Sequence, residues 1–195
     1  MAELVAQAVY QEVLLTLLFM VLAVCLAQWV PLERRLPAAV GVCFAVIGGT
    51  VLVIDYGIQL TVLQPALLAG QTEGLSALTQ YNPHGVFIAL ENVGYAVLGV
   101  AFLFLGAALT AGTSRLERAV RWVFIVGGVL ILAALVLYAT IYRADLDVWF
   151  EVMSMLITWL VLIVSGTMLT VVFGRAVKVA TRPPAAVTTD ALARR

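Results

Sequence analysis

Charged residues are scarce in this chain of 195 residues, and the residue types that most often bind metals are scarcer. Only 11% of the residues are charged, and the sequence has one histidine and two cysteines. A single histidine excludes an HExxH zinc site and bis-histidine haem ligation, because each needs two histidines. Cys25 and Cys43 have no CxxC spacing and lie in apolar stretches, so we expect no structural disulfide.

Several motifs that carry chemistry are also missing. Without a GxxxxGK[ST] loop the chain is not itself an ATPase, and without GxSxG nothing indicates acyl transfer. The only lysine, Lys178, lies outside the apolar runs, which excludes a retinal Schiff base. No basic surface interleaved with aromatic residues supports binding of nucleic acid. We therefore expect no cofactor and no nucleic-acid partner.

Apolar residues dominate what is present. They make up 64% of the sequence, and the mean hydropathy is +1.09, so most of the chain is expected to face lipid. A span needs about 20 apolar residues to cross the bilayer core. We predict an all-α polytopic bundle of about five membrane helices over residues 1–174, and a basic, disordered tail over residues 175–195. The predicted spans are residues 13–30, 38–63, 85–109, 119–142 and 146–173.

Basic residues in the short connections predict the orientation. Cytoplasmic loops carry an excess of Lys and Arg, and nearly all of these residues fall on one side of the predicted spans. That side receives Arg34, Arg35, Arg115, Arg118, Arg121, Arg175, Lys178 and Arg182, whereas the other receives Arg143. The N-terminus is therefore expected outside and the C-terminus inside. The strong preference for arginine over lysine is typical of GC-rich bacterial genomes, which favours the bacterial inner membrane.

The sequence of the connection before the third span predicts two local features. Thr72 could cap a short helix that lies along the membrane surface and carries Leu75 and Leu78. Asn82 suits the N-cap of the third span, with Pro83 at its first helical position.

Polar residues recur at helical spacing within the apolar runs. His84, Glu91 and Tyr95 share one face of the third span, and Asn92 borders that face. All the polar positions gather in the half of the bundle that is predicted to lie toward the outside, where Glu12 of the first span belongs too. The residues predicted to form a binding site are Asp55, Gln59, His84, Glu91, Asn92, Tyr95, Tyr142, Arg143 and Glu151.

Carboxyl groups outnumber the basic residues in that half. Glu91 lies roughly 9 Å inside its span at about 1.5 Å per residue, and a charge at such depth costs a few kcal/mol. The Glu91 side chain must therefore face the bundle interior, where it meets a partner or water, or it must hold a proton. An acidic pocket of this kind would suit a small cation, an amine or transferable protons. The structural alternative is that these groups satisfy one another, with Glu151 paired to Arg143 and His84 at a helix end.

Small residues form a second kind of stripe. Gly41, Ala45 and Gly48 follow one face of the second span, and Gly99 and Gly106 follow one face of the third. Such stripes let helices approach closely. We expect them to pack helices within the chain, and they could also join it to a second copy or to another subunit.

Residues 80–95 read QYNPHGVFIALENVGY. This segment resembles stretches of a family of small bacterial multi-pass membrane proteins of unknown function. The resemblance implies an inner-membrane setting and implies that the region from His84 to Glu91 recurs in such proteins. It implies no activity.

The sequence leaves three functions open. The first is binding, sensing or transport of a small cationic or protonatable solute in an outward-facing pocket centred on Asp55 and Glu91. The second is a membrane enzyme in which these two carboxyls do acid and base chemistry on a lipid-like substrate. The third is an accessory subunit of a membrane complex. The first, which is not enzymatic, is the leading hypothesis.

Overall fold

The computed structural model describes residues 2–78, 82, 84–109, 114–142 and 149–181, and every regular element in these ranges is helical. Five of the elements are long and four are short. The long helices are α1 (Ala2–Trp29), α2 (Arg35–Ile58), α4 (Val86–Ala108), α5 (Arg115–Tyr142) and α6 (Trp149–Ala180). The short elements are η1 (Leu32–Arg34), η2 (Gln59–Leu63), α3 (Gln64–Leu68) and η3 (Ser76–Leu78).

The predicted all-α bundle with five membrane helices is confirmed. The described residues contain 5 helical stretches that are long and apolar enough to cross a membrane. An integral membrane protein with several spans has this composition and these lengths. The stretches are Val9–Trp29, Leu32–Leu68, Val86–Ala108, Arg115–Ile141 and Val152–Lys178.

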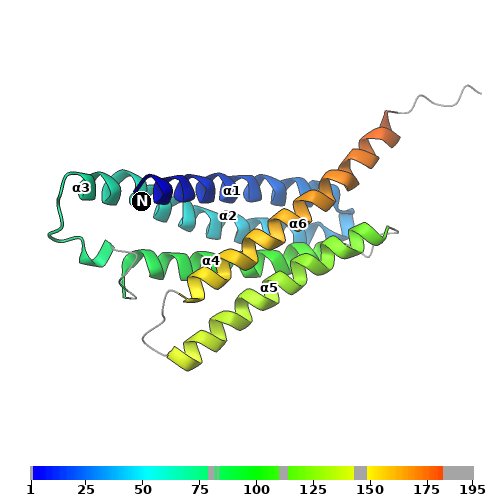
Figure 1. Cartoon of the computed structure of the whole chain (residues 1–195). Helices are drawn as coiled ribbons and strands as arrows, with labels where there is room; N and C mark the ends of the chain where they lie inside the picture. The colour runs from blue at the N-terminus through cyan, green and yellow to red at the C-terminus, as the bar shows by residue number, and fades with distance from the viewer. Residues whose placement is uncertain (1, 79–81, 83, 110–113, 143–148, 182–195) are drawn as a thin grey trace, which may run out of the picture.

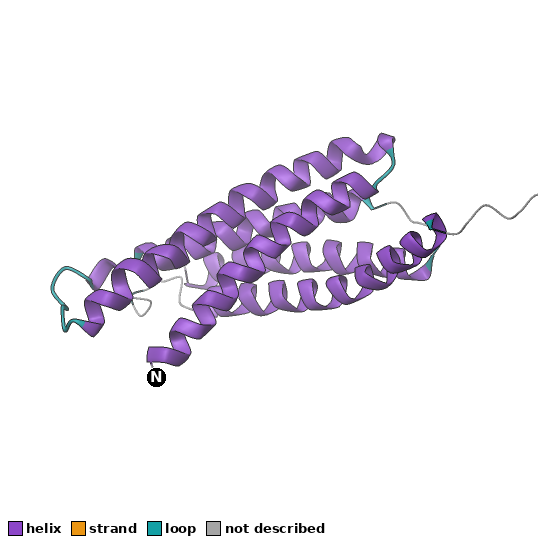
Figure 2. Cartoon of the chain, turned by 90° about the horizontal axis from the view of Figure 1, so that it is seen from above, coloured by secondary structure: helices purple, strands orange, loops and turns teal. Residues whose placement is uncertain are grey.

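Helices α1, α2 and α4 run side by side, and α5 and α6 cross them obliquely as an antiparallel pair (Figures 1 and 2). The most extensive helix contact is between α2 and α4, and α4 also packs against α5, α6 and α1. We call the end of the bundle that holds the start of α1, α3 and the start of α6 the N-terminal end. The opposite end, with the turn between α1 and α2 and the last residues of α6, is the C-terminal end.

Glycines allow the close contact between α2 and α4, as the small-residue stripes predicted. A Cβ added at Gly48 would lie 2.9 Å from the carbonyl oxygen of Gly94, and one added at Gly94 would lie 2.6 Å from Leu52 Cδ2. Further along the same pair, a Cβ at Gly41 would meet Leu105 at 2.9 Å. A helix pair that is this close gains dispersion contacts that larger side chains would prevent.

The second span does not end at Leu63 before Gln64 and Pro65, as its sequence suggested, because the helix continues through the proline to Leu68. The turn before the proline widens into a π-helix, in which the Gln64 N–H donates to the carbonyl of Gln59. A proline removes one helical donor, and its ring crowds the carbonyl four residues earlier. A widened turn accommodates both effects without ending the helix.

The connection before α4 also differs from its prediction. The helix begins at Val86 with Gly85 as the N-cap, so Asn82 is not the cap; Pro83 lies outside the described residues. Asn82 instead forms a turn, in which its Oδ1 accepts from the His84 N–H at 3.0 Å. Its Nδ2 also donates to the Ser76 carbonyl at 2.9 Å. These local hydrogen bonds compete with helix formation.

The short helix predicted after Thr72 is present only as one 3-10 turn, which contains Leu78. The only regular element that the structure describes there is the single turn η3. Gly70 and Gly74 have φ values of 73° and 77°, a left-handed conformation that interrupts a helix.

The basic tail begins later than expected. Helix α6 continues to Ala180, so residues 175–180 are helical, and residues 182–195 lie outside the described residues. Arg175 and Lys178 do not interrupt the helix, because long unbranched side chains lose little rotamer freedom in a helix.

The contact between α2 and α4 gives the first testable prediction. We expect Gly48→Val to lower the free energy of unfolding by about 1–3 kcal/mol, because the added carbons have no space against the α4 backbone. Denaturation of the purified chain in detergent measures this. Gly166→Ala is the control, since nothing lies within 4 Å of a Cβ at that position. Equal stability of the two variants would contradict the packing argument.

Candidate functional site

A cluster of buried polar side chains lies in the N-terminal half of the bundle. Its carboxyl groups belong to Glu12 of α1, Asp55 of α2 and Glu91 of α4, whose side chains are 7%, 0% and 1% exposed. Helix spacing aims these residues inward, since each lies on the apolar, buried face of its own helix. We call the following set the acid cluster: Glu12, Asp55, Tyr56, Gln59, Glu91 and Tyr95.

The amide of Gln59 connects two of the carboxyl groups. Its Nε2 donates to Asp55 Oδ2 at 3.0 Å and to Glu91 Oε1 at 3.3 Å. An amide nitrogen has two hydrogens, so it can serve both oxygens at once. Asp55 and Glu91 therefore share one donor atom, Nε2 of Gln59.

The π-helical turn begins at Gln59 itself. Gln59 follows Asp55 by one α-helical turn, so the two side chains share a face. The wider turn then shifts the register of the residues that follow. Bulges of this type occur frequently at functional sites, and here one coincides with the residue that joins α2 to Glu91.

Two tyrosines extend the cluster. The hydroxyls of Tyr56 and Tyr95 are hydrogen-bonded at 2.8 Å and buried. Glu91 and Glu12 both lie within electrostatic range of the Tyr56 hydroxyl. One phenol of α2 therefore interacts electrostatically with carboxyl groups from two neighbouring helices.

Glu12 links the cluster to α6. Trp159 Nε1 donates to Glu12 Oε1 at 2.7 Å across 147 residues of sequence. Sequence reasoning left Glu12 out of the site, although Glu12, Thr16, Phe19 and Ala23 all lie on one buried face of α1 at helical spacing. That spacing could have placed Glu12 in the predicted site. Trp159 carried no such signal, since a tryptophan in an apolar helix can equally face lipid.

Helix α6 adds hydroxyl groups to the interior. Ser154, Thr158 and Ser165 are 0%, 4% and 0% exposed, and their hydroxyl oxygens have no hydrogen-bond partner in the structure. They follow one another at intervals of four and seven residues, which puts them on one face. The buried side of α6 therefore offers polar atoms with spare hydrogen-bonding capacity.

His84 and Asn92 do not join the acid cluster. His84 lies before the start of α4 and is exposed. Asn92 is half-buried, and the adjacent position on the helix turns it about 100° from Glu91 at 3.6 residues per turn. Its buried Oδ1 has no hydrogen-bond partner in the structure.

For three other residues of the predicted binding site, the structure does not describe the side chain. Arg143 lies outside the described residues, and so do the side chains of Tyr142 and Glu151. Of the predicted set, the structure thus brings together Asp55, Gln59, Glu91 and Tyr95.

Charge is separated along the bundle. All described arginines and the lysine lie at the C-terminal end, in the turn between α1 and α2, the start of α5 and the end of α6. The acid cluster lies in the other half. Across the part of the chain that the structure describes, no group of three His, Cys, Asp or Glu residues could hold a metal ion.

Comparison of the chain with protein-family models, with curated proteins and with solved structures gives no match. The resemblance of residues 80–95 to small bacterial membrane proteins therefore stays a prediction.

The tyrosine pair is suited to a double-mutant cycle. We expect Tyr56→Phe and Tyr95→Phe each to lower the free energy of unfolding by about 1–3 kcal/mol, because each leaves a buried hydroxyl without the other. The double variant should lose less than the sum of the two, by at least about 0.5 kcal/mol. Additive losses would show that the hydroxyls do not stabilise one another.

Proposed function

We propose that this integral membrane protein binds a small monovalent cation, such as an alkali ion or a small protonated amine, at the acid cluster and thereby senses it or helps to move it. The observation that carries the proposal is the shared position of Gln59 Nε2 between Asp55 and Glu91, at 3.0 and 3.3 Å. A small cation would find two carboxyl oxygens there within reach of one point.

The Gln59 amide is a neutral substitute for such a cation. It offers hydrogens to both carboxyl groups but no full charge, whereas a cation adds a Coulomb attraction to each carboxylate. A cation that displaces the amide would therefore gain electrostatic stabilisation from the same two oxygens. Gln59 then acts as an internal competitor that holds the carboxyls in place when no ligand is bound.

Like charge within the cluster favours the same conclusion. Glu12 and Glu91 both lie within electrostatic range of Tyr56, and Asp55 shares a donor with Glu91. Carboxylates crowded into an apolar span repel one another, and burying them costs free energy unless charge is neutralised. A bound cation or a shared proton supplies that neutralisation.

Buried hydroxyl groups of α6 supply neutral oxygen atoms in the interior of the bundle. Thr158 is adjacent in sequence to Trp159, which contacts Glu12, and its own hydroxyl is buried with no hydrogen-bond partner in the structure. Oxygen ligands of this kind replace the hydration shell of a cation that enters a protein interior. The α6 face with Ser154 and Ser165 continues this polar line along the helix.

The cluster is closed, whereas the sequence suggested an open, outward-facing pocket. Asp55 and Glu91 are 0% and 1% exposed, so a cation reaches them only after helices separate. Two features suit such a movement. The π turn can change register, and the joint between α1 and α6 includes one hydrogen bond from Trp159.

The enzyme alternative gains less support. A lipid-like substrate would need an apolar groove that leads to the carboxyls. The groove between α5 and α6, described below, is lined by apolar residues and contains none of the acid cluster. The accessory-subunit alternative needs small-residue faces that are open to a partner. The glycines on such faces of α2, α4 and α5 pack inside the chain, so most of these faces are already covered. Gly166 and Gly174 of α6 have open space.

Thermal stability in different salts tests the proposal. Sodium, potassium or methylammonium chloride, at equal ionic strength, should raise the melting temperature of the purified chain above its value in N-methylglucamine chloride. At 100 times Kd the ligand contributes about 2.7 kcal/mol, or roughly 5–10 °C for a chain of this size. Asp55→Asn and Glu91→Gln should abolish the shift. Gln59→Leu should enlarge it, because the competing amide is gone.

Glu73→Gln is the matched control, since Glu73 is an exposed acid at the same end of the bundle. It should keep the full shift. If none of the small cations stabilises the wild-type chain, or if the Asp55 and Glu91 variants respond as the control does, the proposal is wrong.

We also propose that the N-terminal end faces outside, on the basis of the arginine distribution. In a background of Cys25→Ala and Cys43→Ala, a membrane-impermeant maleimide should label Gln71→Cys in intact cells. Glu33→Cys, exposed at the C-terminal end, should react only after the cells are permeabilised. The reverse pattern would overturn the orientation.

A further inference from the structure

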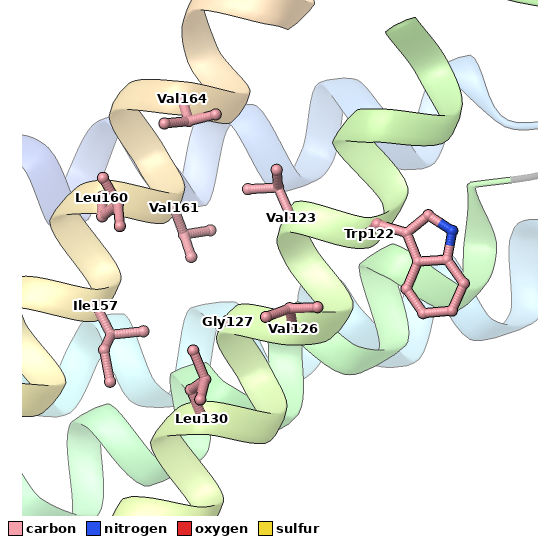
Figure 3. A pocket seen from close by; sticks show the side chains of 9 residues that line it. All are labelled: Trp122, Val123, Val126, Gly127, Leu130, Ile157, Leu160, Val161 and Val164. Atoms are coloured by element: carbon pink, nitrogen blue, oxygen red, sulfur yellow. The ribbon is translucent and has the colours of Figure 1, made fainter. Parts of the chain in front are cut away.

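A groove runs along the outer surface of the bundle between α5 and α6 (Figure 3). It has a volume of about 380 Å³, within the range of sites that hold small molecules, and every side chain that lines it is apolar. The lining residues are Trp122, Val123, Val126, Gly127, Leu130, Ile157, Leu160, Val161 and Val164.

The floor and the walls of the groove come from different residues. Gly127 lies against Val161, so the two helices touch at the floor. Val126, Leu130 and Leu160 stand on either side of it, with 48%, 49% and 64% of their surfaces exposed. Large exposed apolar side chains with a hollow between them leave room for a flexible hydrocarbon chain.

Basic residues continue both walls toward the C-terminal end. Arg118 and Arg115 lie four and seven residues before Trp122, which puts them on its face of α5. Arg175 lies eleven residues after Val164, on the same face of α6. All three arginines are exposed. Toward the C-terminal end, the apolar groove is therefore followed by exposed positive charge on both helices, and on α5 Trp122 lies between the groove and the arginines.

We propose that the groove binds an anionic phospholipid of the bilayer, whose acyl chain lies between α5 and α6 and whose phosphate contacts Arg115 and Arg118. Arginine pairs well with phosphate because its planar fork presents two parallel donors. Tryptophan is enriched at the level of lipid headgroups, and Trp122 is 58% exposed between the groove and the arginines. Basic pockets between membrane helices bind lipids of this charge.

The same charges argue against a second copy of the chain as the occupant. Two copies in one membrane share their orientation, so a two-fold contact along this groove would bring Arg115, Arg118 and Arg175 of one copy against those of the other. Like charges across such a contact are unfavourable. A phosphate relieves this repulsion, whereas a second copy increases it.

Native mass spectrometry of the full chain with added phosphatidylglycerol or phosphatidylcholine tests the proposal. The wild type should retain phosphatidylglycerol preferentially. Each arginine near a lipid surface changes the affinity by roughly fivefold, so Arg115→Gln with Arg118→Gln should weaken phosphatidylglycerol binding by about 25-fold. Phosphatidylcholine binding should weaken by less, because its choline group offsets the charge of its phosphate.

Arg34→Gln with Arg35→Gln is the matched control. It removes the same charge from the same end, at exposed positions in the turn between α1 and α2. It should retain the preference. If both double variants lose phosphatidylglycerol equally, binding is only a general attraction to positive charge and the proposal is wrong.

The groove itself is tested by Leu160→Trp, which fills it from an exposed position without touching an arginine. This variant should lose most of the bound phosphatidylglycerol, since the acyl chain has no space. Retention at the wild-type level would overturn the placement of the chain. A wild-type dimer that Leu160→Trp dissociates would assign the groove to a second copy instead.

Discussion

The hydrogen bonds from one amide, that of Gln59, to Asp55 and Glu91 set the conditions for the rest of the bundle. Two carboxyl groups buried in apolar spans are stable only where hydrogen-bond donors are held close to them. Burying a carboxyl group without a donor costs more free energy than one hydrogen bond contributes to stability. The bridge therefore requires α2 and α4 to remain at a short, fixed separation at the level of Gln59 and Glu91.

Glycine provides that separation. A Cβ at Gly48 would meet the Gly94 carbonyl oxygen, and a Cβ at Gly94 would meet the Leu52 side chain. Both glycines lie within two turns of the acids. The tight packing and the polar site are thus two consequences of one helix pair. Movement of α4 relative to α2 would disturb both, so any opening of the site is more easily made by α1 or α6, which reach the cluster through Glu12 and Trp159.

Helical periodicity was sufficient to predict the five spans and to bring Asp55, Gln59 and Glu91 to the interior, because both depend on local spacing and on the cost of charge in lipid. It could not predict Trp159, whose partner is 147 residues away, or the open space between α5 and α6. It also failed at Pro65, where the usual rule that proline ends a helix was overridden by a widened turn. The prediction of Asn82 as the N-cap of α4 also failed, since the hydrogen bonds of Asn82 form a turn before the helix starts.

The two proposed sites use opposite chemistry at opposite ends of one scaffold. Acids are buried near the N-terminal end, where low solvent exposure strengthens the electrostatic interactions of each charge. Arginines are exposed at the C-terminal end, where they can contact the charged surface of a bilayer. Helix α6 contributes to both, through Trp159 at the acid cluster and Leu160 in the groove. These residues are adjacent in sequence and face different directions. The contact with Glu12 and the wall of the groove therefore lie on the same turn of α6.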